Sequence, residues 1–166
     1  MEHRFEEIYA RHREAVEAYT RRRVPADLVD DVVSETFLVC WRKLGDVPAE
    51  ALPWLYAVAR KTIANQRRAA ARAVAGGGEA VAAGEPEPTG DPQLAAAFAR
   101  LGDRDREVLR LVAWEGLSVA QAAAVLECTT VSCRVRFHRA KRRLAALLEA
   151  GTAGAPSRPR PEGAIR

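Results

Sequence analysis

The sequence predicts an all-α protein in which a flexible linker joins two small helical domains. Apolar residues recur every three or four positions, which is the spacing of amphipathic helices. Alternating β-branched runs bounded by turns, the pattern typical of strands, are missing from the sequence. A stretch without large apolar residues divides the helical pattern, and 166 residues are enough for two small domains.

Three apolar stripes predict three or four helices within residues 1–72. The stripes span residues 5–19, 28–44 and 52–64. Proline residues mark the expected helix boundaries, because proline lacks the amide hydrogen that the interior of a helix requires. These residues are Pro25, Pro48 and Pro53.

Residues 73–92 are mainly glycine, alanine, proline and glutamate. Such a segment cannot bury a core, so it is expected to be a flexible linker. Residues 151–166 are basic and rich in proline and glycine, and they are expected to be a disordered tail. The predicted domains are therefore residues 1–72 and 93–150.

The second domain begins where helical spacing resumes, at Leu94. Asp103 is the expected N-cap of the next helix, and Gly116 is its expected end.

A short helix is predicted from Ser118 to Leu126. Ser118 and Gln121 have the spacing of a capping box, in which each residue satisfies an amide of the other. Four alanines within this helix allow a neighbouring helix to approach closely. After a short turn, Thr129 or Thr130 can cap the next helix.

The last predicted helix is apolar on one side and basic or polar on the other. The apolar stripe recurs at i, i+4, i+7, i+11 and i+15 and consists of Cys133, Phe137, Ala140, Leu144 and Leu148. With the short helix as a brace, this is the helix-turn-helix arrangement, whose second helix enters the major groove of DNA. Arginines at its start suit guanine, and later cations suit phosphate. The alternative is a surface helix with a solvated basic face. The candidate DNA-binding residues are Thr130, Arg134, Val135, Arg136, His138, Arg139 and Arg142.

The charge distribution favours a polyanionic partner. The 26 Lys and Arg residues exceed the 22 Asp and Glu residues by only four. Basic residues nevertheless cluster at 60–72 and 134–143, whereas acidic residues crowd positions 2–50. The two basic patches therefore indicate a nucleic-acid partner more strongly than the small net charge does.

Several function classes are excluded. The three cysteines, Cys40, Cys128 and Cys133, are too few and too widely spaced for a disulfide framework or a zinc site, so they are expected to be free thiols. No metal site, cofactor, P-loop or catalytic triad is apparent, and no enzymatic activity is expected. The charged N-terminus is not a secretory signal, and no apolar run reaches the roughly 18 residues of a membrane span. A cytoplasmic protein is expected.

The second predicted helix carries carboxylates on one side, with aromatic residues below them. An acidic helix repels DNA but suits a basic protein surface, where aromatic residues serve as anchors. For Phe37 alone, packing in the core of the domain is the favoured interpretation. The candidate protein-binding residues are Asp30, Asp31, Glu35, Phe37 and Trp41.

The third predicted helix combines aromatic and cationic side chains. Unpaired bases are bound by this combination, which offers a stacking face and phosphate neutralisation. The aromatic residues also fit the core. The candidates are Trp54, Tyr56, Arg60, Lys61, Asn65 and Arg68.

Several segments follow one another in a recognisable order. "FEEIYARH", "DDVVSETFLVCWRKL" and "PWLYAVARKTIANQRR" lie within residues 5–72. "LGDRDREVLRLVAWEGLSVAQAAAVLECTTVSCRVRFHRAKRRL" lies within residues 94–148. This ordered set resembles the group IV, or extracytoplasmic-function (ECF), sigma factors of the bacterial sigma-70 superfamily.

The resemblance implies a role for each domain. The first would be sigma domain two, which binds the β′ clamp helices of core RNA polymerase through its acidic helix. Its loop at residues 45–53 and the helix from Trp54 would capture an unpaired base and recognise the −10 element of promoter DNA. The second would be domain four, which recognises the −35 element and contacts the β flap. The family also makes an anti-sigma factor a candidate partner.

Two positions depart from the pattern of the family. Ser34 stands where the family often has glutamine, which alters a contact expected with the clamp. Val135 stands where the reading face often has a polar residue. An apolar side chain there suggests a contact with a thymine methyl group.

Two alternatives remain from the sequence. A stand-alone helix-turn-helix regulator would bind duplex DNA by itself and dimerise on inverted repeats. A helical adaptor would use its basic faces for acidic proteins and would show no sequence preference for DNA.

Overall fold

The computed structural model describes residues 2–75 and 90–153. Within these two ranges the chain forms helices and no strand, which confirms the all-α prediction. The N-terminal half contains α1 (Glu2–Arg21), α2 (Ala26–Arg42), the 3-10 turn η1 (Leu44–Asp46) and α3 (Ala51–Ala75). The C-terminal half contains α4 (Pro92–Ala99), α5 (Asp103–Ala113), α6 (Val119–Val125) and α7 (Thr130–Ala153).

The N-terminal half is a bundle in which α1, α2 and α3 all contact one another. Their apolar stripes converge, so that Val16, Val32 and Leu55 are fully buried. Arg4 of α1 anchors the connection from α2 to α3. Its guanidinium donates hydrogen bonds to the carbonyl oxygens of Leu44 at 2.9 Å and Val47 at 2.5 Å.

The C-terminal half is organised around α7, which α4, α5 and α6 all contact. Ala122 and Ala123 of α6 and Ala140 of α7 are buried, because small side chains let these helices approach closely. The predicted capping box of Ser118 and Gln121 is confirmed, with amide-to-side-chain distances of 2.8 and 3.2 Å.

Some helix boundaries differ from the expected ones. Asp103 is the first residue of α5, and Gly102 occupies the N-cap position without a side-chain cap. Pro53 lies in the first turn of α3. Proline is tolerated there, because the amides of the first turn make no hydrogen bond within the helix. Residues 73–75 and 151–153 were expected in the linker and the tail but are helical. Residues 76–89 and 154–166 lie outside the described part of the chain.

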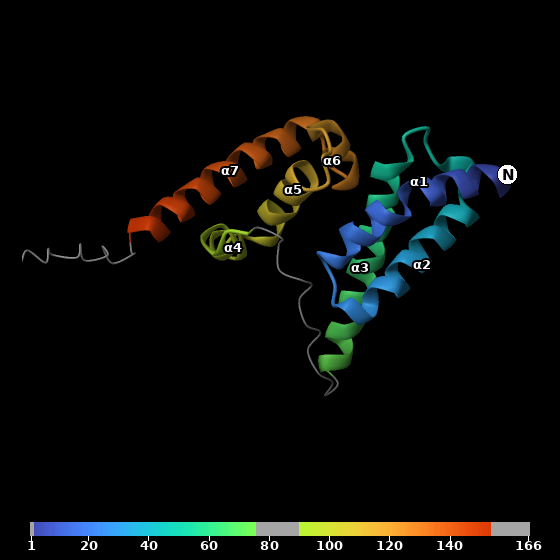
Figure 1. The fold of residues 1–166 in the computed structure, drawn as a ribbon, viewed down its shortest axis with the longest axis horizontal. Helices are drawn as coiled ribbons and strands as arrows, with labels where there is room; N and C mark the ends of the chain where they lie inside the picture. Colours follow the sequence, from blue (N-terminus) through green and yellow to red (C-terminus); the bar gives the residue numbers. More distant parts are fainter. Residues whose placement is uncertain (1, 76–89, 154–166) are drawn as a thin grey trace, which may run out of the picture.

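The two halves touch through α3 and α6. In Figure 1, α6 lies next to the N-terminal bundle, and α7 extends from there away from it. Cys40, Cys128 and Cys133 are free thiols, as predicted. No helix in residues 2–75 and 90–153 is long and apolar enough to cross a membrane, and the same residues contain no cluster of potential metal ligands.

Candidate nucleic-acid and protein interfaces

Helix α7 is anchored by its apolar stripe. Cys133 and Ala140 are fully buried against the other helices of the C-terminal half, and Phe137 is half-buried between them. Thr129 Oγ1 accepts a hydrogen bond from the amide of Ser132 at 3.1 Å, so Thr129 caps the helix rather than Thr130. The predicted buried side of this helix is confirmed.

The opposite side of α7 is open to solvent. At 100° per residue, the positions furthest from the buried stripe form an outward face. Its side chains are all exposed, and they are Val131, Arg134, Val135, His138, Arg139 and Arg142. Basic side chains with free space around them suit a polyanion, and the N-terminal turns suit base edges.

Arg136 does not share this outward face. It is half-buried and lines a cleft between the halves, together with Arg60 and Arg67 of α3. In this arrangement of the chain Arg136 therefore lies apart from the other DNA-reading candidates of α7, and its contact with DNA stays a prediction. Thr130 is exposed at the start of the helix.

The acidic side of α2 is exposed at Asp30, Asp31 and Glu35. Phe37, in contrast, is 3% exposed and meets the ring of Tyr9 edge-on at 4.8 Å. Phe37 is thus a core residue, and its predicted contact with a partner is wrong.

Trp41 is the aromatic residue that α2 presents to solvent. It is 49% exposed, and its ring rests edge-on against Phe5 at 5.1 Å. Tyr9 and Leu38 are also exposed and line the same groove between α1 and α2. Carboxylates beside exposed aromatic rings can anchor a basic protein surface.

The two aromatic residues in the first turns of α3 differ in how deeply their side chains are buried. Tyr56 is 2% exposed and stacks on Tyr19, with ring centroids 4.6 Å apart. Burial, followed by the charge of Glu115, raises the pKa of Tyr56 to about 12. Tyr56 therefore cannot stack on a base, and its assignment to DNA is wrong. Trp54 is half-buried and lines a groove between α2 and α3.

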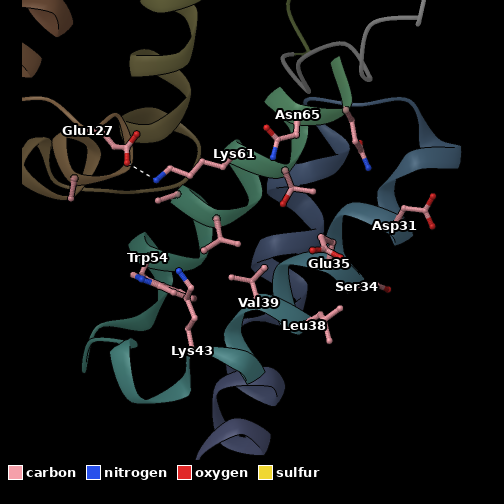
Figure 2. A pocket seen from close by; sticks show the side chains of 15 residues that line it. Asp31, Ser34, Glu35, Leu38, Val39, Lys43, Trp54, Lys61, Asn65 and Glu127 are labelled. Atoms are coloured by element: carbon pink, nitrogen blue, oxygen red, sulfur yellow. Dashed lines mark ion pairs between the residues drawn. The ribbon is translucent and has the colours of Figure 1, made fainter. Parts of the chain in front are cut away.

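Figure 2 shows this groove, with Lys61 and Asn65 further along α3. Lys61 Nζ forms an ion pair with Glu127 Oε1 of the C-terminal half at 2.6 Å. Asn65 Oδ1 accepts from Arg68 at 2.5 Å, and both side chains are exposed. The cationic side of α3 thus lies next to the junction between the halves.

A buried ionic cluster, which no local sequence pattern predicts, joins the halves at the end of α1. Arg23 donates to Glu115 at 2.9 Å and to both oxygens of Glu107 at 3.1 and 3.2 Å. Arg22 also pairs with Glu115. The exposed fractions of the Arg23 and Glu115 side chains are only 4% and 2%.

The ring and the hydroxyl of Tyr19 also contact this cluster. The Arg23 guanidinium carbon lies 3.6 Å from the centroid of the Tyr19 ring, and the Tyr19 hydroxyl donates to Glu107 at 3.3 Å. Burial raises the pKa of Tyr19, and Glu107 raises it further, so the phenol stays neutral. Burial opposes the charge of Arg23, but the carboxylates of Glu107 and Glu115 outweigh it and raise the pKa of the guanidinium. The run "RRRV" at the end of the first helical stripe was the available signal, although it does not identify the partner carboxylates.

Two family descriptions match this chain. "Sigma-70 region 2" matches residues 8–73, and "Sigma-70, region 4" matches residues 92–144. The RNA polymerase sigma factor CnrH of Cupriavidus metallidurans is 30% identical, and the match covers 88% of this chain and 87% of that protein. The ECF RNA polymerase sigma factor SigL of Mycobacterium tuberculosis is 31% identical over 156 residues, with coverage of 86% and 87%.

Solved structures give the same result. The sigma factor RpoE from Bartonella quintana, in complex with the anti-sigma factor NepR, superposes with a TM-score of 0.70 at 25% identity. That match covers 87% of this chain and 96% of the other. CnrH in complex with the cytosolic domain of CnrY superposes with a TM-score of 0.62 at 30% identity, and the match covers 88% of each chain.

Proposed function

This chain belongs to the ECF branch of the sigma-70 family of RNA polymerase sigma factors, and we propose that it divides promoter recognition among three surfaces. The N-terminal half acts as sigma domain two and the C-terminal half as domain four. Helix α2 binds core RNA polymerase, α3 binds the −10 element, and α7 binds the −35 element.

The outward face of α7 is the observation that carries this proposal. A braced helix exposes six neighbouring side chains, three of them arginines, and none of them is required by the core. Phosphate contacts from such a face supply affinity, and contacts to base edges from its first turns supply specificity.

The exposed carboxylates of α2, with Trp41 beside them, support binding to a basic surface on core polymerase. Asp31 and Glu35 are one helical turn apart on the same side as the groove of Figure 2. Because a negatively charged helix repels DNA, this side of the N-terminal half remains available to protein.

Helix α3 supplies the −10 contact in this proposal. Trp54, Asn65 and Arg68 are accessible, whereas Lys61 must leave Glu127 before it can reach a phosphate. Opening of the duplex comes from trapping unpaired bases on this surface, without hydrolysis and without a cofactor. The chain acts in the cytoplasm, where core polymerase is found.

An anti-sigma factor is part of the proposal as a regulatory partner. Both solved structures named above are complexes, one with the anti-sigma factor NepR and one with the cytosolic domain of CnrY. A protein of this kind would keep the chain from core polymerase.

The test is binding to purified core RNA polymerase and transcription from genomic DNA of the source organism. Wild type is expected to co-elute with core and to direct transcripts from defined start sites. Asp31→Arg/Glu35→Arg is expected to lose core binding, whereas Glu14→Arg, an exposed charge reversal on α1, retains it. Arg134→Ala/Arg139→Ala is expected to keep core and lose the promoter.

Arg11→Ala/Arg100→Ala is the control for that loss of two positive charges, because both residues are exposed and lie off the outward face of α7. A wild-type protein that ignores core polymerase yet shifts duplex DNA alone would refute the proposal. The stand-alone regulator would then take its place.

A further inference from the structure

The outward face of α7 begins with two valines. Val131 is 70% exposed and Val135 is 44% exposed, and both are among the few large apolar side chains that the described residues present to solvent. With His138 and Arg142 they follow one another at i, i+4, i+7 and i+11. The four form a single stripe opposite the buried Cys133.

Packing does not explain these valines. The core contacts of α7 are made by the opposite stripe of Cys133, Phe137 and Ala140. Valine is also a poor choice for an exposed helix position, because its branched side chain loses rotamer freedom there. A face that served only phosphate binding would be expected to carry lysine or arginine at these two positions.

Their place in the helix indicates what they contact. In a helix-turn-helix, the N-terminal residues of the second helix reach base edges, whereas flanking residues meet the backbone. The thymine C5-methyl is the apolar group that base pairs present in the major groove, and small apolar side chains contact it. Four residues advance a helix by about 6 Å, which is close to two base-pair steps of about 3.4 Å.

We propose that Val131 and Val135 contact thymine methyl groups in the major groove and set a preference for T·A pairs in the upstream promoter element. This inference rests on the proposed function of α7 as the helix that reads that element. His138, one turn further on, then offers a ring nitrogen to the next base edge or phosphate. Arg142, at the end of the stripe, contacts phosphate.

The first experiment selects sequences with the complete chain bound to core polymerase, from promoter DNA randomised in the upstream element. Wild type is expected to enrich thymine on either strand at two positions no more than two base pairs apart. Val131→Ala and Val135→Ala are each expected to lose the preference at one of the two positions. Val112→Ala is the control, because it makes the same truncation on α5, outside the helix-turn-helix, and is expected to change neither position.

The second experiment replaces each selected thymine by deoxyuridine, which removes only the methyl group. This replacement is expected to weaken wild-type binding about three- to fivefold, as for the loss of one buried methyl contact. It should change the binding of the matching valine variant by less than twofold, because that contact is already missing.

The outcomes separate the inference from the proposed function. If wild type enriches an upstream element but deoxyuridine costs wild type and variants equally, the inference fails and the sigma assignment of α7 stands. If the variants instead lose binding to core polymerase, the valines contact protein, and the inference fails. If wild type enriches no upstream element, the proposed function of α7 and this inference fail together.

Discussion

Two ion-pair contacts between the halves use the same chemistry in opposite surroundings. At the end of α1, Arg23 and Glu115 pair with side chains that are 4% and 2% exposed. At the junction of α3 and α6, Lys61 and Glu127 pair with side chains that are 60% and 56% exposed. Both are ion pairs between residues distant in sequence, yet their burial gives them different consequences.

Burial decides how much free energy it costs to separate the two charges of each ion pair. A buried charge that loses its partner keeps its desolvation cost, so the cluster at α1 commits both halves to one arrangement. An exposed pair is screened by salt, and each partner is readily solvated when it leaves. Lys61 can therefore exchange Glu127 for a phosphate at little cost, whereas Arg23 cannot leave Glu115 cheaply.

The largest effect is expected for Glu115→Ala. This change removes the carboxylate shared by Arg22 and Arg23, and it should destabilise the contact between the halves by about 3–5 kcal/mol. Urea unfolding gives the free energy, and small-angle X-ray scattering should show a larger radius of gyration. Glu115→Gln, which keeps an acceptor, should lose less, and Glu14→Ala on the surface of α1 should change neither quantity. An unaltered scattering profile for Glu115→Ala would show that the cluster does not hold the halves together.

A smaller effect is expected within the C-terminal half, where Arg143 of α7 pairs with Asp105 of α5. The two side chains are 67% and 11% exposed. Arg143→Ala leaves a buried carboxylate unpaired and should cost about 2 kcal/mol. Asp105→Ala leaves an arginine that can turn into water and should cost less. Equal losses in urea unfolding of the two variants would contradict this ordering.

The buried tyrosines predict a loss of stability in alkali. The pKa of Tyr56 rises from 10.0 to about 12 on folding, so the folded chain holds this proton more tightly than the unfolded chain. Its contribution is fully present below pH 10 and is lost as the pH rises to 12.

Tyr56→Phe has no hydroxyl to titrate, and its free energy of unfolding should fall about 2 kcal/mol less than that of wild type over this range. The measurement is urea unfolding at a series of pH values. Parallel curves for the two proteins would contradict the prediction.

The smallest effect is expected at the exposed pair. Hydrogen bonding to Lys61, together with its charge, lowers the pKa of Glu127. The contribution of the pair is therefore present above the ordinary pKa of glutamate and is lost as the pH falls through the lowered value. In Lys61→Ala, NMR titration should find the pKa of Glu127 raised towards its ordinary value, and added salt should do the same in wild type. Lys43→Ala, which removes an exposed lysine before α3, should leave the pKa of Glu127 unchanged.

Local patterns in the sequence predicted much of the fold and of the α7 surface. The apolar stripe from Cys133 predicted which side of α7 is buried, and the capping box at Ser118 predicted where α6 begins. These predictions succeed because helical periodicity and caps depend on residues within a few positions of one another. The same reasoning predicted the family, to which the comparisons assign the chain.

The aromatic residues show where such reasoning ends. Phe37, Trp41, Trp54 and Tyr56 lie beside charged residues in the sequence, and each fitted either the core or a binding surface. The structure buries Phe37 and Tyr56 and exposes Trp41, because their orientations depend on how three helices pack together. A binding role assigned by sequence position alone was wrong for the two buried residues.

The sequence by itself determined the helical architecture, the basic outward face of α7 and membership of the sigma family. Each of these depends on the identity and spacing of neighbouring residues. Only the tertiary structure decided that Arg22 and Arg23 meet Glu107 and Glu115 across the two halves. The reason is physical: the two arginines lie more than 80 positions from the two glutamates along the chain, and they become partners only when folding removes all four charges from water.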